Sequence, residues 1–113
     1  MCWFVALSLT AGFCEEFIFR GYLIWALQPW VSWWGAAAIA LILFALGHSY
    51  QGVNGIVRTG ILGAIMTLVF AISGSLWPAI LLHALIDIGS GLIAWFVLRE
   101  QAVVRDTPFA TTA

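Results

Sequence analysis

The sequence predicts an all-α, polytopic membrane protein: a bundle of about four transmembrane helices with a polar site between them. Hydrophobic residues make up 64% of the 113 residues, charged residues make up 8%, and the mean hydropathy is +1.08. Soluble domains carry about 25% charged residues, and nucleic-acid-binding domains add a basic surface, so both classes are excluded. The apolar residues form long runs without alternation, which favours membrane helices over the strands of a barrel.

Four apolar runs are separated by polar residues, glycine and proline, and each is close to the length that crosses a bilayer. The expected helices cover about residues 1–27, 30–48, 56–72 and 78–98. We expect residues 1–98 to form one membrane-embedded core and residues 99–113 a polar C-terminal tail.

Short polar segments set the expected helix ends. Gln28-Pro29 ends the first helix, because proline lacks a backbone donor and restricts the residue before it. The polar residues 49–55 separate the second helix from the third, and residues 73–75 end the third. Ser75 is a suitable N-cap for the fourth helix, with Pro78 in its first turn.

The arginines predict the orientation in the cell membrane. With four spans, Arg58, Arg99 and Arg105 lie on the same side as both termini, whereas the loops at 28–30 and 73–77 carry no charge. Because positively charged loops remain in the cytoplasm, we expect a multi-pass protein with both termini cytoplasmic.

Four charged residues lie inside the apolar runs: Glu15, Glu16, Arg20 and Asp87. A charge at the centre of a membrane helix costs about 2.5–3.5 kcal/mol, so these side chains must face one another, water or a buried cavity. Ionisable groups in such positions are candidates for a functional site.

Their spacing groups these residues with two histidines. Glu16 and Arg20 are four residues apart on one helix, with the acid first, which is the favourable order for an ion pair. His83 and Asp87 have the same spacing on the fourth helix, and His48 ends the second. A buried histidine beside a carboxylate is a general-base arrangement.

These residues also form three motifs in order. Residues 15–20 read EExxxR, residues 44–48 read FxxxH, and residues 83–87 read Hxxx[N/D]. Together with the segment 74–80, they resemble the CPBP family of intramembrane proteases, also called the Abi or type II CAAX-prenyl-endopeptidase family.

The resemblance implies an endopeptidase whose site lies within the bilayer. Glu15 and His48 would activate a water for attack on the scissile carbonyl, and His83 and Asp87 would stabilise the oxyanion. Position 87 is Asp where many members have Asn. Ionised Asp cannot donate a hydrogen bond, so Asp87 either is protonated or orients His83.

In the same resemblance, Glu16 and Arg20 support the catalytic residues. A mechanism without a cofactor is preferred, since the sequence has no HExxH zinc motif. The alternative is a metalloprotease that binds zinc through Glu15, Glu16, His48 and His83.

The substrate expected from this resemblance is a membrane-associated peptide, either a CAAX-type prenylated protein or a leader or bacteriocin-like peptide. The other expected partner is the lipid bilayer, and no nucleic acid is expected. Two functions without proteolysis remain open: a membrane scaffold or immunity-type protein, and a proton relay through the buried acids and histidines.

Overall fold

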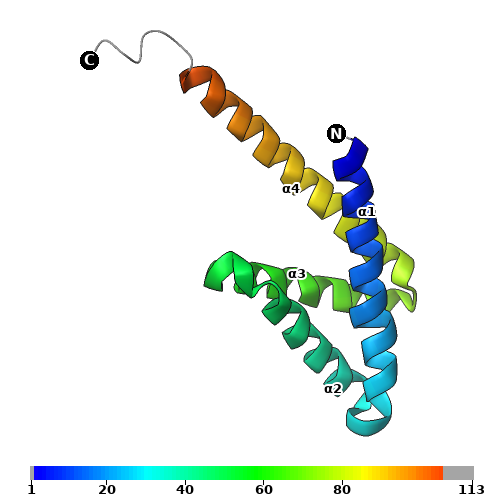
Figure 1. The fold of residues 1–113 in the computed structure, drawn as a ribbon. Helices are drawn as coiled ribbons and strands as arrows, with labels where there is room; N and C mark the ends of the chain where they lie inside the picture. The colour runs from blue at the N-terminus through cyan, green and yellow to red at the C-terminus, as the bar shows by residue number, and fades with distance from the viewer. Residues whose placement is uncertain (1, 106–113) are drawn as a thin grey trace.

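The computed structural model describes residues 2–105, and every element in that part of the chain is helical (Figure 1). In chain order the elements are α1 (Cys2–Glu16), the π-helical segment η1 (Phe17–Leu23), α2 (Ile24–Gly47), the 3-10 turn η2 (Ser49–Gln51), α3 (Gly52–Ser73) and α4 (Leu76–Arg105). The predicted all-α class is confirmed.

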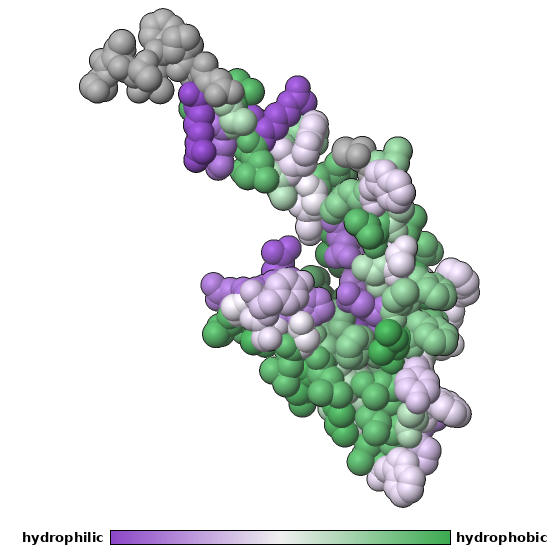
Figure 2. Space-filling model, viewed as in Figure 1, coloured by the Kyte–Doolittle hydropathy of each residue, from purple (hydrophilic) through white to green (hydrophobic). Residues whose placement is uncertain are grey.

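Three continuous helical stretches among the described residues are long and apolar enough to cross a membrane: Cys2–Gly47, Ser49–Ser73 and Leu76–Arg105. Hydrophobic side chains cover most of the face seen in Figure 2, as expected for a surface that contacts lipid. The count of four spans is not confirmed, because the first two expected helices belong to one stretch of 46 residues.

The predicted break at Gln28-Pro29 is wrong, because both residues lie inside α2. The break is at Ser32, whose backbone φ is 68° and which joins two helical parts across a kink. The Ser32 hydroxyl accepts a hydrogen bond from the Gly35 N–H at 3.3 Å, as an N-cap does. The chain therefore bends at Ser32, three residues after Pro29, and the Ser32 side chain caps the second part of the helix.

The other turns are shorter than expected. After His48 and η2, helix α3 already begins at Gly52, so the polar residues 52–55 form its first turn and are not a loop. At its other end, Gly74 has a left-handed φ of 66°. The predicted cap at Ser75 is confirmed, since its hydroxyl accepts a bond from the Trp77 N–H at 3.4 Å.

Helix α4 extends further than the predicted end at residue 98. It continues to Arg105, with the Arg99 guanidinium 5.3 Å from the centre of the Trp95 ring. No glycine or proline interrupts residues 99–105, so the helix has no reason to end there. The rest of the expected tail, residues 106–113, lies outside the described residues.

Small residues allow the helices to approach closely. Ala36, Ala37 and Ala40 are at most 3% exposed and form a core with Ile24. Gly12 of α1 faces α4, where an added Cβ would lie 3.3 Å from the Ile80 carbonyl oxygen. This close contact brings the C-terminal part of α1 next to the first third of α4.

Candidate active site

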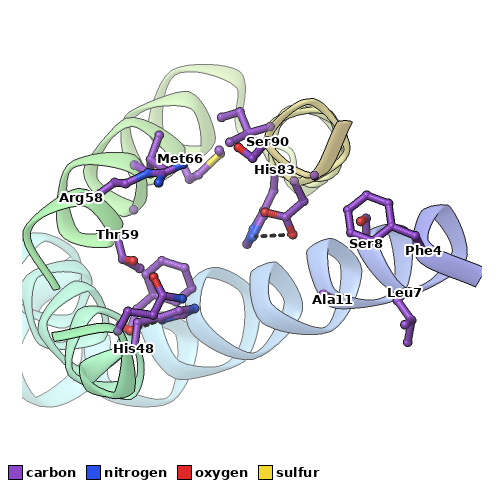
Figure 3. A pocket seen from close by; sticks show the side chains of 17 residues that line it. Phe4, Leu7, Ser8, Ala11, His48, Arg58, Thr59, Met66, His83 and Ser90 are labelled. Atoms are coloured by element: carbon purple, nitrogen blue, oxygen red, sulfur yellow. Dashed lines mark hydrogen bonds and ion pairs between the residues drawn. The ribbon is translucent and has the colours of Figure 1, made fainter. Parts of the chain in front are cut away.

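A cavity of about 520 Å³ lies between the helices, and histidines from two of them line it (Figure 3). His83 and Asp87 come from α4, and His48 comes from the C-terminal end of α2. Three of the four predicted catalytic residues therefore line one space. Other lining residues include Ser8 of α1, Thr59, Gly63 and Met66 of α3, and Ser90 of α4.

Next to this cavity, Glu16 and Arg20 form a buried ion pair. Their relative exposures are 0% and 1%, and Arg20 Nη1 lies 3.3 Å from Glu16 Oε1. Arg20 is in η1, which begins directly after Glu16. The predicted contact between residues four apart is confirmed, although a π-helical turn follows the acid.

Helix α3 binds the other side of the Arg20 guanidinium. Nη2 donates to the Gly63 carbonyl oxygen at 2.9 Å, and Nε donates to the Thr67 hydroxyl at 3.5 Å. Thr67 in turn donates to the same carbonyl oxygen at 2.8 Å. The guanidinium also lies over the Phe44 ring, 4.3 Å from its centre. One cation thus connects three helical segments through charge-assisted contacts.

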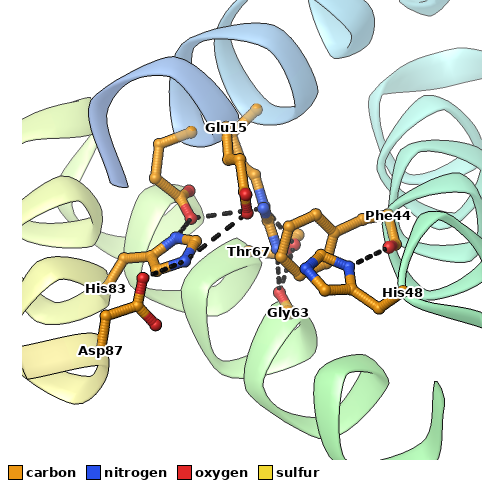
Figure 4. A network of polar contacts seen from close by, with 9 residues as sticks. Glu15, Phe44, His48, Gly63, Thr67, His83 and Asp87 are labelled. Atoms are coloured by element: carbon orange, nitrogen blue, oxygen red, sulfur yellow. Dashed lines mark hydrogen bonds and ion pairs between the residues drawn. The ribbon is translucent and has the colours of Figure 1, made fainter. Parts of the chain in front are cut away.

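His83 is surrounded by three carboxyl groups (Figure 4). Its Nδ1 lies 2.8 Å from Glu16 Oε1, and an ionised carboxylate there accepts the Nδ1 proton. On the other side of the ring, Nε2 lies 3.6 Å from Glu15 Oε2 and 3.7 Å from Asp87 Oδ2. Glu16 therefore fixes the ring, and Nε2 faces the remaining two acids.

Glu15 differs from Glu16 in its contacts. Its side chain is 31% exposed, whereas Glu16 is fully buried, and its Oε2 atom, like Glu16 Oε2, is buried and has no hydrogen-bond partner among the described residues. A buried carboxylate oxygen in this state is costly unless a water or another donor binds to it. This oxygen is the one that faces His83 Nε2.

His48 does not join this cluster. Its Nδ1 donates to the Phe44 carbonyl oxygen at 2.9 Å, which leaves Nε2 free to accept a hydrogen bond. The Phe44 ring is 4.9 Å from the His48 ring and 6.1 Å from the His83 ring, centre to centre. Among the described residues, no hydrogen bond or ion pair joins His48 to Glu15, the expected partner in water activation.

Gly63 and Thr67 also belong to this site, although the sequence does not single them out. Both lie within an apolar run, and the only signal was a small residue followed four positions later by a hydroxyl. An added Cβ on Gly63 would lie 2.9 Å from Arg20 Nη2 and 2.8 Å from Leu41 Cδ1. Only glycine leaves room for the guanidinium at this position.

The four residues of the zinc alternative, Glu15, Glu16, His48 and His83, do not converge on a common coordination position. Among residues 2–105, no three His, Cys, Asp or Glu side chains are placed to hold one metal ion. Glu16 Oε1 already contacts Arg20 and His83, and Phe44 lies between the two histidines. These residues, as arranged here, do not fit a zinc site.

The three long apolar helical stretches, and the buried Glu–Arg–His network beside a cavity between them, define a membrane protein with ionisable groups inside its helix bundle. Residues 1–89 match the family model described as type II CAAX prenyl endopeptidase Rce1-like, and the chain belongs to this family. It is therefore a multi-pass membrane protein of a CAAX-type intramembrane protease family. Comparisons with curated proteins and with solved structures gave no match.

Proposed function

We propose that this protein hydrolyses a peptide bond in a membrane-associated substrate, with a water activated by Glu15. The observation that carries the proposal is the Oε2 atom of Glu15, which is buried and has no hydrogen-bond partner among the described residues. It lies 3.6 Å from Nε2 of His83, and His83 lines the cavity. This oxygen has no protein donor and therefore keeps the acceptor capacity that a general base needs for its water, which would reach it from the cavity beside His83.

The reaction would proceed by direct attack of that water. Glu15 takes a proton from it, and the oxygen forms a bond to the scissile carbonyl carbon. The C–N bond then breaks, and the proton held by Glu15 passes to the leaving amine. His48 Nε2, free on the opposite wall of the cavity, is a second acceptor for the water.

His83 and Asp87 would stabilise the oxyanion. Glu16 occupies Nδ1 of His83, so the imidazolium form presents its Nε2–H towards the acids and the cavity. Of the two roles open to Asp87, donation from a protonated carboxyl suits this geometry better. Glu16 already orients the ring, and Asp87 lies on the Nε2 side.

The substrate we propose is a prenylated CAAX-type protein or a leader or bacteriocin-like peptide, reached from the bilayer. Family membership supports the prenylated class. We further propose that both termini are cytoplasmic, from the arginine distribution, with the stretch Cys2–Gly47 crossing the membrane twice through its bend at Ser32. We also propose that the reaction needs no cofactor, because the alternative ligand set is not assembled.

The test is a cleavage assay on the full chain, purified and reconstituted in lipid nanodiscs. Wild type, Glu15→Gln and the control Glu100→Gln, an exposed residue of α4, are compared on a prenylated peptide with and without a chelator. Removing a general base is expected to lower the rate by about 10²–10⁴-fold, and the control should match wild type.

Each other outcome has a defined meaning. Full turnover in Glu15→Gln would refute the assignment of the base. Loss of wild-type activity with chelator would favour the metalloprotease alternative. Proton flux in liposomes without cleavage would indicate a relay, and neither activity would indicate a scaffold.

A further inference from the structure

Arg58 is the one arginine on the wall of the site cavity among the described residues. It lies in the second turn of α3 and is exposed, and α4 with His83 and Ser90 lies across the space from it (Figure 3). Within residues 2–105 it makes no hydrogen bond or ion pair. Asp87 lines the same cavity, yet it is not paired with Arg58.

Two of the other three arginines have partners among the described residues, and the third, Arg105, lies in the last turn of α4, away from the cavity. The Arg20 guanidinium is fully used by Glu16, Gly63 and Thr67, and the Arg99 guanidinium stacks on Trp95. Arg58 alone presents an unused, bidentate donor to the space that contains the proposed catalytic groups. Such a guanidinium matches the geometry of a carboxylate.

We propose that Arg58 binds the free C-terminal carboxylate of the substrate, so that the enzyme cuts near the end of a chain. This inference rests on the proposed function. It selects among the substrates left open, because a substrate cut at a leader junction in mid-chain has no carboxylate near the scissile bond, whereas a CAAX-type C-terminus does.

The spacing along α3 is consistent with this assignment. Gly63, which contacts Arg20 beside the Glu16–His83 pair, follows Arg58 by five residues, or about 7.5 Å of helix. An extended peptide covers about 3.3–3.6 Å per residue, so a few residues of substrate would cover this part of α3.

The surroundings of Arg58 also suit a hydrophobic peptide end. A second hollow of about 410 Å³ adjoins the cavity and shares Arg58, Leu62 and Ile86 with it. Its remaining lining is Asn54, Val57 and Ile61, so most of its wall is apolar. A C-terminal residue with an apolar side chain can place its carboxylate on Arg58 and its side chain in this hollow.

The test compares two prenylated peptides of identical sequence, one ending in a free carboxylate and one in an amide. The measured quantity is the ratio of their kcat/KM values in nanodiscs of neutral phosphatidylcholine. A charged hydrogen-bonded pair predicts a ratio of about 10–100 for wild type. Arg58→Gln should lower this ratio towards one, Arg58→Lys should retain part of it, and the control Arg99→Gln should keep the wild-type ratio.

A wild-type ratio of one, or an unchanged ratio in Arg58→Gln, overturns the proposal. The other plausible anion for an exposed arginine is a lipid headgroup. If Arg58→Gln affects both peptides equally, and only when phosphatidylglycerol is present, Arg58 binds lipid and the proposal is wrong.

A binding arm separates this inference from the proposed function. If wild type cuts neither peptide, the proposed function fails. Fluorescence anisotropy with labelled versions of the same peptides then tests Arg58 alone. Tighter binding of the carboxylate peptide that disappears in Arg58→Gln supports the carboxylate site, and equal binding of both peptides by wild type refutes it.

Discussion

Gly63 offers the most direct test of how the site is built, because one methyl group should displace the central cation. A Cβ at this position would lie 2.8 Å from Leu41 Cδ1, 2.9 Å from Arg20 Nη2 and 2.9 Å from Phe44 Cδ1. Ordinary contacts between such atoms are about 3.5–4.0 Å, so each neighbour must retreat by roughly 0.5–1 Å. Arg20 cannot retreat freely, since Glu16 and the Gly63 carbonyl oxygen bind it.

Overpacking of this kind costs about 1–3 kcal/mol of unfolding free energy. Gly60→Ala is the matched control: it lies on the same helix, and its Cβ would meet only Ala45 Cβ, at 3.7 Å. Both substitutions raise helix propensity by the same amount, up to about 1 kcal/mol, so their difference isolates the steric term.

The measurement is unfolding by dodecyl sulfate in mixed micelles, followed by the fluorescence of the seven tryptophans. The unfolding free energy of Gly63→Ala should be about 1–3 kcal/mol lower than that of Gly60→Ala. Its cleavage rate should also fall, because a displaced Arg20 no longer holds Glu16, which orients His83. Equal stability of the two variants would refute the packing argument for Arg20.

Two further predictions concern the acids around His83. Asp87→Asn should keep the cleavage rate within about tenfold of wild type, because the amide is a permanent hydrogen-bond donor of the same shape. Asp87→Ala should lower kcat by about 10²–10³-fold. If the Asn variant is as inactive as the Ala variant, the Asp87 carboxyl has another role. Glu16→Gln should lower the unfolding free energy by about 3–5 kcal/mol in the same micelle assay, because the buried Arg20 charge loses its partner. A loss below about 1 kcal/mol would mean that water or lipid compensates Arg20.

The sequence was sufficient to identify the charged side chains and His83 that the structure brings together, because charges in an apolar chain are rare and helical spacing is regular. It did not identify Gly63 and Thr67, which bind Arg20. Glu16–Arg20 and His83–Asp87 are both in contact as their four-residue spacing predicts. The contact between Glu16 and His83, 67 positions apart, depends on how α1 crosses α4, and spacing alone does not contain that information.

Features that depend on backbone detail were not predictable in the same way. The sequence favours a break at Pro29, because proline is the stronger local signal, whereas α2 restarts at Ser32. Serine is a common N-cap, and here its hydroxyl accepts a hydrogen bond from the N–H of Gly35, three residues later. The π-helical turn at Phe17–Leu23 has no compositional signature, yet it contains Arg20 and directly follows the acid pair.

The adjacent acids of the EE pair are therefore expected to have separate roles, and stability and activity distinguish them. Glu16 is fully buried and binds both Arg20 and His83, so it is part of what holds the helices together. Glu15 is 31% exposed, and among the described residues its side chain makes a polar contact only with His83, at 3.6 Å, so few interactions that stabilise the fold depend on it. A substitution at Glu15 should then remove turnover with little change in unfolding, whereas one at Glu16 should weaken the fold first. His83 contacts both acids: its Nδ1 faces Glu16, and its Nε2 faces Glu15, the proposed general base.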